Sequence, residues 1–292
     1  MYMTGFADEA AITLDGQIKA TQELGWQYIE SRSIDKINIH NLDNKAFDEV
    51  EAKLKDANIK INCFGSTIAN WQKEINQPID SSIEEAKRAI ERMHRLDTKL
   101  IRIMSFALLK DNEPDNQMKE ERFKRLRLIV DMFLTEGLTP VHENCMNYGG
   151  LSYKHTLELI DNVPGLKLVF DTGNPVFTDD RSQPKPYPKQ NSWEFYSAVR
   201  EHISYIHIKD GVWNNAKEDC DYTYPGQGQG CVKEIMADLI KNNYDGGISI
   251  EPHMAAVFHD NNQDVDENEM YNIYVEYGKQ MQKMILDLGG IL

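Results

Sequence analysis

The strongest constraint on the fold is an alternation of two hydrophobic patterns that repeats eight times along the chain. Short apolar runs typical of buried strands are each followed by a longer stretch in which apolar residues recur at helical spacing. The strand-like runs cover residues 4–9, 27–33, 60–66, 99–105, 138–144, 166–172, 203–210 and 246–252. Eight β–α units in 292 residues predict an α/β fold, a single (β/α)8 TIM barrel, with a doubly wound sheet as the alternative.

The stretches between the strands carry helix signals of their own. Two short apolar stripes lie at 83–93 and 123–133, and the clearest stripe consists of Met270, Ile273, Tyr277, Met281, Met284 and Leu288. Gly25, Gly137 and Gly165 each stand just before a strand, where glycine commonly ends a helix because it readily adopts a positive φ. We therefore expect a helix between successive strands.

The connections between these elements differ in length. Those from helix to strand are short, whereas those from strand to helix include long ones at 108–119, 175–191, 212–230 and 255–267. In a barrel, all strand-to-helix connections lie at the carboxyl ends of the strands, where barrel enzymes place their active sites. We expect one domain over residues 1–292, with these loops at its working face.

The charge of the chain restricts its partners. The formal net charge is −15 at pH 7, whereas proteins that bind nucleic acid or anionic membranes use clustered Lys and Arg. The densest basic run, KEERFKRLRL at 119–128, has the pattern of a solvated helix face. We expect a small neutral or cationic molecule as partner, and neither nucleic acid nor a membrane; a homo-oligomer is left open.

Targeting signals and cysteine patterns point to the cytoplasm. The opening MYMTGFADEA shows neither the basic nor the apolar region of a secretory signal, and no stretch approaches the roughly 20 apolar residues of a membrane span. The four cysteines, Cys63, Cys145, Cys220 and Cys231, form no CxxC pair. The expectation is a cytoplasmic protein with reduced thiols.

Side chains suited to metal binding stand at four consecutive strand ends. Glu143, Asp171, His207 and Glu251 lie in the fifth to eighth predicted strands and are expected to converge on one side of the barrel mouth. Three carboxylates in one place would repel each other and hold raised pKa values unless a cation neutralised them. Oxygen-rich ligation with one imidazole predicts one divalent metal ion, Mn²⁺ first, with Mg²⁺, Co²⁺ or Zn²⁺ as alternatives.

Each of these residues also has an ordinary structural explanation. Glu143 could be a strand-end charge and Glu251 a salt-bridge partner, while His207 could be a buried histidine of the core. Asp171 could form a turn, since it opens the segment Asp-Thr-Gly-Asn-Pro. Their occurrence at corresponding ends of successive strands favours the metal site.

Several segments resemble the xylose isomerase-like barrels of sugar isomerases and epimerases. The most specific are VHEN, FDTGN, IHIKD, the glycine-rich PGQGQG and SIEP, and the likeness begins at GFADEA near the start of the chain. The resemblance implies one divalent metal ion held by Glu143, Asp171, His207 and Glu251. It also implies that Glu143 and Glu251 form an acid/base pair.

The implied site suits proton transfer at a carbon next to a carbonyl group. A keto sugar or cyclitol ketone could chelate the metal, which would stabilise the enediolate formed when a C–H proton leaves. Two glutamates on opposite sides of that carbon could exchange or move the proton. The expected activity is that of a metal-dependent isomerase or epimerase, and the alternative is a dehydratase of an inosose-like substrate.

Two further functions are disfavoured. The same superfamily includes abasic-site (AP) endonucleases, which use three zinc ions and additional histidines. Asn174 stands where those nucleases and the ketose 3-epimerases have a histidine, which argues against a nuclease and leaves the substrate open. A non-catalytic sugar-binding protein would not need the second glutamate.

Other polar residues near the strand ends are candidate substrate contacts: Asn174, Lys209, Asp210, His253, Glu30 and Arg32. For Glu30, Arg32 and His253 the competing explanation is a strand-end ion pair, such as Glu30 with Arg102. The glycines around Gln227 weakly suggest a phosphate cradle, but the acidic segment 218–221 before them disfavours an anion. We expect an unphosphorylated polyol or keto sugar.

Overall fold

The computed structural model describes residues 1–255 and 266–292 and contains all eight predicted strands. They are β1 (Tyr2–Gly5), β2 (Tyr28–Ser31), β5 (Lys60–Gly65), β6 (Leu100–Ile103), β7 (Thr139–Glu143), β8 (Lys167–Asp171), β9 (Ile203–Ile208) and β12 (Gly247–Ile250). Every neighbouring pair with a ladder is parallel, in the order β1-β12-β9-β8-β7-β6-β5-β2.

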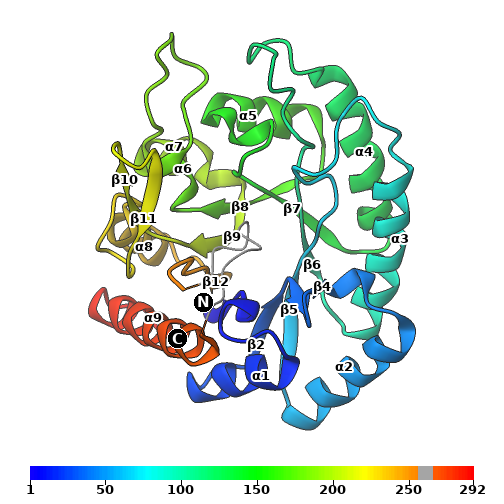
Figure 1. Ribbon diagram of the computed structural model, residues 1–292, viewed down its shortest axis with the longest axis vertical. Helices are drawn as coiled ribbons and strands as arrows, with labels where there is room; N and C mark the ends of the chain where they lie inside the picture. Colours follow the sequence, from blue (N-terminus) through cyan, green and yellow to red (C-terminus); the bar gives the residue numbers. More distant parts are fainter. Residues whose placement is uncertain (256–265) are drawn as a thin grey trace.

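The strands form a nearly closed barrel. Strands β1 and β2 stand at the two ends of the sheet order, and a parallel backbone bridge between Phe6 and Glu30 joins them. A doubly wound sheet would leave its two edge strands far apart. The predicted TIM barrel is therefore confirmed and its alternative is excluded, as the ring of strands in Figure 1 shows.

Helices surround the barrel in the predicted positions (Figure 1). They are α1 (Leu14–Glu23), α2 (Asn44–Ala57), α3 (Asp80–Arg95), α4 (Lys119–Thr135), α5 (Tyr153–Asn162), α7 (Ser192–Val199), α8 (Val232–Lys241) and α9 (Glu267–Asp287). Short 3₁₀ helices cover Ala7–Glu9, Ile39–Asn41, Gly149–Leu151 and Arg200–His202. Gly25, Gly137 and Gly165 have φ values of 71°, 69° and 85°, as expected for residues that end helices before a strand.

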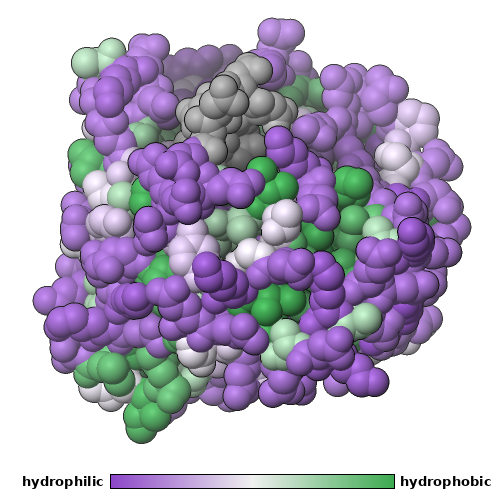
Figure 2. All heavy atoms as spheres, turned by 60° about the horizontal axis from the view of Figure 1, so that its bottom comes forward, coloured by the Kyte–Doolittle hydropathy of each residue, from purple (hydrophilic) through white to green (hydrophobic). Residues whose placement is uncertain are grey.

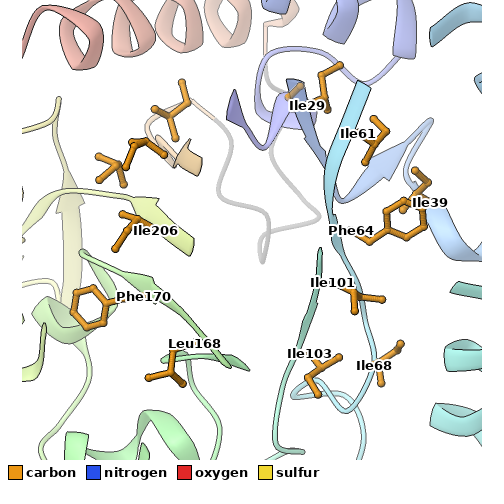
Figure 3. Packing of buried hydrophobic residues seen from close by; sticks show 14 of the residues in the cluster. Ile29, Ile39, Ile61, Phe64, Ile68, Ile101, Ile103, Leu168, Phe170 and Ile206 are labelled. Carbon is orange, nitrogen blue, oxygen red and sulfur yellow. The ribbon is translucent and has the colours of Figure 1, made fainter. Parts of the chain in front are cut away.

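Side chains alternate along the strands between the helices and the barrel interior. Phe64, Phe170 and Ile206 belong to the main apolar cluster and point away from the barrel centre in Figure 3. Inside the barrel, a separate small apolar cluster joins four strands through Cys63, Val141, Val169 and Tyr205. Glu143, Asp171 and His207 each follow a member of this inner cluster by two residues, so they face the interior one layer nearer the carboxyl ends.

The long strand-to-helix segments carry short elements of their own. The segment 175–191 begins within α6 (Asn174–Phe177), and 212–230 includes most of an antiparallel hairpin of β10 (Gly211–Asn214) and β11 (Asp219–Tyr222). A second hairpin, β3 (Ser33–Ile34) with β4 (Ile37–Asn38), follows β2. Of the predicted loop 255–267, residues 256–265 lie outside the described residues.

The surface fits the acidic composition. On the face drawn in Figure 2 the exposed atoms are mainly hydrophilic, with smaller hydrophobic areas between them. In the part of the chain that the structure describes, no helix is long and apolar enough to cross a membrane. All four cysteines are free thiols.

Candidate metal centre

Glu143, Asp171, His207 and Glu251 meet inside the barrel at the carboxyl ends of the strands. Glu143 and Asp171 end β7 and β8, His207 lies in β9, and Glu251 directly follows β12; all four are buried. One possible ligand atom from each lies within 4.8 Å of the other three. Ligands bound at about 2.1 Å to one divalent ion lie about 3 to 4.2 Å from one another, so the four groups lie close to the spacing of one cation site.

The two oxygens of Asp171 have different partners. Oδ1 accepts hydrogen bonds from the backbone N–H groups of Gly173 (2.8 Å) and Asn174 (2.7 Å), which shapes the turn after β8. Oδ2 lies 2.9 Å from the Nζ atom of Lys209. Asp171 can therefore form the turn through Oδ1 and still offer Oδ2 as a metal ligand.

The ring of His207 is oriented by a carboxylate behind it. Its Nε2 lies 3.1 and 3.0 Å from the two oxygens of Glu30, and Ser249 donates a hydrogen bond of 2.6 Å to the same carboxylate. Nδ1 then faces Glu143 Oε1 at 3.8 Å and Glu251 Oε2 at 4.0 Å. Among the described residues this buried Nδ1 has no hydrogen-bond partner. A histidine that binds a metal commonly donates its other ring N–H to a carboxylate in this way.

Glu143 is held on both of its oxygens. Arg102 Nη1 donates to Oε2 at 2.9 Å, and the Asn174 side-chain amide donates to Oε1 at 3.0 Å. The expected ion pair of Glu30 with Arg102 is therefore wrong. Both residues point into the barrel, where Glu30 bonds with His207 and Arg102 bonds with Glu143 instead.

Glu251 has a similar arrangement on the opposite side of the cluster. Arg32 Nη1 donates to its Oε1 at 3.0 Å, and Lys209 Nζ lies 3.0 Å from its Oε2. Each of the two glutamates thus has a guanidinium group on one oxygen, while the other oxygen faces His207.

The pKa values of the two glutamates follow from these contacts. Burial raises the pKa of Glu143, but Arg102 and His207 outweigh burial and hold that pKa well below its ordinary range. Burial also raises the pKa of Glu251, yet the positive groups around it, Lys209 first, lower that pKa further. Both glutamates are therefore ionised at neutral pH.

The pKa values of Asp171 and His207 are raised instead of lowered. Burial dominates at Asp171 and raises its pKa to about 7, although Lys209 acts against it. Burial lowers the pKa of His207, but the charges of Glu30 and Glu143 outweigh it and raise that pKa to about 10. A cluster that attracts a proton this strongly has an excess of negative charge that a metal cation can neutralise.

The excess negative charge comes from the ionic network that includes and surrounds the four residues. It contains six carboxylates (Asp8, Glu9, Glu30, Glu143, Asp171 and Glu251) and three permanent cations (Arg32, Arg102 and Lys209). Three negative charges remain before His207 is counted. A divalent ion among the carboxylates would reduce this imbalance, so both charge and donor set fit a metal.

A second group with ligand spacing lies beside the first. Glu9, Glu251 and His253 are buried together, and the Nδ1 of His253 lies 2.9 Å from Glu9 Oε1. Arg32 donates to Glu9 at 3.1 Å and to Glu251 at 3.0 Å, which already places a positive charge among these groups. The first group, with three carboxylates and one imidazole, offers one ligand more than the second.

The glycine-rich segment after β11 encloses a carboxylate of its own chain. Asp210 accepts four backbone hydrogen bonds, from Gly211 (2.9 Å), Gly226 (2.8 Å), Gly228 (3.0 Å) and Gly230 (2.8 Å). A Cβ atom at Gly228 would come within 2.4 Å of Asp210 Oδ1, so this close approach requires glycine. The amides that could hold a phosphate are occupied by Asp210.

The remaining predicted residues take different places around the centre. Asn174, Lys209, Glu30 and Arg32 each contact at least one of the four clustered residues, and His253 Nε2 lies 3.7 Å from Glu251 Oε1. The sequence prediction missed Asp8 and Glu9, although both stand at the end of the first predicted strand, where the same rule applies.

Comparisons with known proteins agree with this architecture. Residues 18–271 match the profile of the xylose isomerase-like TIM barrel family, and no curated protein matches the sequence. Similar solved structures include a xylose isomerase-like TIM barrel protein from Mycobacterium smegmatis in complex with magnesium, with 16% identity, a TM-score of 0.70 and coverage of 98% of this chain and 97% of that one.

Two other similar structures have functional names. The probable 3-DHS dehydratase AsbF of Bacillus anthracis, involved in petrobactin synthesis, has 16% identity and a TM-score of 0.70 over 97% of this chain and 99% of that one. A D-allulose 3-epimerase from Methylomonas sp., in complex with D-allulose, has 15% identity and a TM-score of 0.66 over 96% of each chain. At these identities the likeness shows the fold alone.

Proposed function

Because the chain belongs to the xylose isomerase-like TIM barrel family, we propose that it is a metal-dependent isomerase or epimerase of a keto sugar or cyclitol ketone. The observation that carries this proposal is the buried Nδ1 of His207, which faces two glutamates and, within the described residues, has no hydrogen-bond partner. Glu143, Asp171, His207 and Glu251 would hold one divalent ion, Mn²⁺ before Zn²⁺, Co²⁺ or Mg²⁺. When bound, the ion would act as a Lewis acid toward the oxygens of the substrate.

Glu143 and Glu251 are the proposed acid/base pair. They extend from β7 and from the end of β12, with β8 and β9 between them in the sheet, so they approach the centre from different sides. Arg102 and Arg32 favour the ionised carboxylates, which is the form that accepts a proton from carbon. Return of that proton to a neighbouring carbon gives isomerisation. Epimerisation requires that the second glutamate, once it has taken up a proton, gives that proton to the opposite face of the same carbon.

The polar groups around the centre suit a neutral, hydroxylated substrate. The Oδ1 of Asn174 is buried and, among the residues described, accepts no hydrogen bond, so a substrate hydroxyl could donate to it. We propose Asn174, Lys209 and His253 as substrate contacts, and Glu30 and Arg32 as groups that orient the ligands. Asp210 occupies the amides of the glycine-rich segment, which supports a substrate without phosphate.

A dehydratase is the second candidate, and Lys209 favours it. Its ammonium group lies 2.9 Å from Asp171 and 3.0 Å from Glu251, beside the position where a substrate would bind. A fixed positive charge there would stabilise the negative charge that develops on a departing hydroxyl group. The first step, removal of a proton next to the carbonyl, is the same as in the isomerase.

Metal content is the first test. The purified protein is expected to hold about one equivalent of divalent metal by elemental analysis, to lose it to a chelator and to regain it on reconstitution. A protein that holds no metal, and takes up none when Mn²⁺, Co²⁺ or Zn²⁺ is added, would rule the mechanism out.

The second test is deuterium exchange from D₂O into a panel of keto sugars and inososes, followed by NMR. Glu143→Gln and Glu251→Gln are expected to abolish exchange into the true substrate while the protein stays folded. The control is Glu85→Gln, because Glu85 is also buried but pairs with Lys73 outside the metal centre. Loss of water from the product, measured by mass spectrometry, separates a dehydratase from an isomerase or epimerase.

A further inference from the structure

Phe6 is a fully buried aromatic ring that belongs to neither apolar cluster. Its exposure is 0%, yet it is absent both from the main cluster under the helices and from the inner cluster of the barrel. Its ring lies 4.4 Å from Arg32 Cζ and 5.1 Å from Arg102 Cζ, and it meets the ring of His207 edge-on with 4.9 Å between the centroids. The ring therefore packs against the polar groups of the proposed metal centre.

The two arginines on this ring are the same two that hold the glutamates. Arg32 donates to Glu251 at 3.0 Å, and Arg102 donates to Glu143 at 2.9 Å. One side chain thus contacts His207 directly and reaches two more of the proposed ligands through one guanidinium group each.

An aromatic ring can attract both guanidinium groups here, which an aliphatic side chain cannot do. Its face carries a negative electrostatic potential that attracts guanidinium groups, and this attraction strengthens where water is excluded. Both arginines are buried and positively charged, so their guanidinium groups repel each other. The attraction of the ring for both groups offsets part of that repulsion. With the ring in place, each guanidinium group can keep one glutamate oxygen while the other oxygen faces the centre.

The position of the ring is itself fixed by the closure of the barrel. The Phe6 N–H donates to the carbonyl of Ile250 at 3.0 Å, and its backbone bridges to Glu30. Gly65 leaves the room that the ring needs, because a Cβ atom there would come within 2.5 Å of Phe6 Cε1.

We propose that Phe6 is a positioning residue of the metal centre, which sets the placement of Glu143, Glu251 and His207 and thereby the affinity for the metal. The proposal rests on the proposed metal site but goes beyond it, since it assigns a role to a residue outside the proposed metal ligands and substrate contacts.

The test replaces Phe6 with phenylalanines that carry one, two or three ring fluorines. Fluorine draws electron density from the ring face and weakens its attraction for cations while nearly keeping the shape of the ring. The dissociation constant of Mn²⁺ or Co²⁺, measured by chelator competition, is expected to rise stepwise and to reach roughly tenfold for three fluorines, as for other groups that orient metal ligands. Phe6→Leu is expected to weaken binding at least as much and to shift the visible spectrum of bound Co²⁺.

The chain offers a matched control in Phe47 on α2. This ring is also fully buried, and it lies 4.8 Å from Arg92 Cζ and 4.7 Å from Arg95 Cζ, on the outer helices rather than at the centre. The same fluorine series at Phe47 is expected to leave the metal dissociation constant within twofold of the wild type.

The outcomes separate this inference from the function on which it rests. If the wild type binds no metal, the proposed function and the role of Phe6 both fail. If the wild type binds metal and the Phe6 series binds it equally well, only the positioning role fails. Equal losses in the Phe6 and Phe47 series would show a general effect of fluorination and would also overturn the role.

Discussion

The Nζ atom of Lys209 lies 2.9 Å from Oδ2 of Asp171, so a buried ammonium group pairs with the carboxyl group that ends strand β8. The same ammonium lies 3.0 Å from Oε2 of Glu251. Both oxygens belong to the group of four in which we place the metal. A divalent ion bound there would therefore compete with Lys209 for the same negative charge.

Replacement of Lys209 by methionine is expected to tighten binding of Mn²⁺ by roughly tenfold or more, because about 1.4 kcal/mol of removed repulsion equals a factor of ten. The metal-free variant is expected to be less stable than the wild type, since two buried carboxylates lose their partner. Chelator competition measures the first effect and thermal unfolding with and without metal the second. Lys73→Met, which breaks the ion pair with Glu85 elsewhere, should leave metal affinity unchanged. Weaker metal binding by the Lys209 variant would show that the amine supports the site instead.

Glu30→Gln is expected to weaken metal binding by roughly 10- to 100-fold, the usual cost of removing a carboxylate that orients a metal-binding histidine. The glutamine oxygen can still accept the Nε2–H hydrogen bond of His207, so the fold is retained and only the negative charge is lost. Titration of the metal-free protein with Mn²⁺ measures the change, with Glu85→Gln as the buried control. Unchanged affinity would mean that His207 needs no charged partner.

Asp210→Asn is expected to lower the free energy of unfolding by about 2 to 4 kcal/mol, because hydrogen bonds to a charged acceptor are lost and the new NH₂ group meets backbone N–H donors. Hydrogen exchange should rise in the segment 226–230, whose glycines bond to this carboxylate. Metal affinity should stay within a few-fold of the wild type. A half-buried counterpart outside this segment, Asp221→Asn, should have a smaller effect on stability, and equal losses in both variants would contradict this account.

His40 makes stability depend on pH on the acid side. Burial, aided by the positive charge of Lys73, lowers its pKa to about 3 from an ordinary value near 6.5, and its Nε2 accepts a hydrogen bond from the Thr67 N–H at 3.2 Å. As the pH falls, His40 is therefore protonated in the unfolded chain before it is protonated in the folded protein. Above about pH 6.5, His40 does not change the free energy of unfolding. As the pH falls from 6.5 toward 3, it lowers that free energy by up to about 1.4 kcal/mol per pH unit.

The variant His40→Gln tests this pH effect, since glutamine can accept the same hydrogen bond without titrating. Urea unfolding at pH 7 and pH 5 is expected to show a drop in stability that is about 2 kcal/mol smaller in the variant than in the wild type. Identical drops in the two proteins would show that His40 is not the group responsible.

The sequence was sufficient to predict the barrel and the convergence of four ligand candidates, for a physical reason. Strand periodicity determines which side chains face the barrel interior, and the parallel order brings the strand ends to one mouth. Asp171 and His207 illustrate this, because each follows an inner-cluster residue, Val169 or Tyr205, by two positions.

The sequence did not predict in the same way which opposite charge each buried side chain pairs with inside the barrel. At the centre of the mouth, side chains from many strands lie within reach of several opposite charges, and packing decides among them. Glu30 therefore pairs with His207 across the barrel, and Arg102 pairs with Glu143 on the neighbouring strand. Asp210 shows the same limit, since nothing in its local pattern predicts that its partners are glycine amides up to 20 residues away.

The bridge between Phe6 and Glu30 also has a consequence for how the protein is made. Within the described residues, strand β1 forms a regular ladder only with β12, which is synthesised last of the barrel strands. The ladder of β1 can therefore form only after β12 has been synthesised. Capture of the proposed metal, for which Glu251 at the end of β12 is a proposed ligand, is expected to be among the final events of folding. The time course of metal uptake during refolding would then report when the two ends of the chain meet.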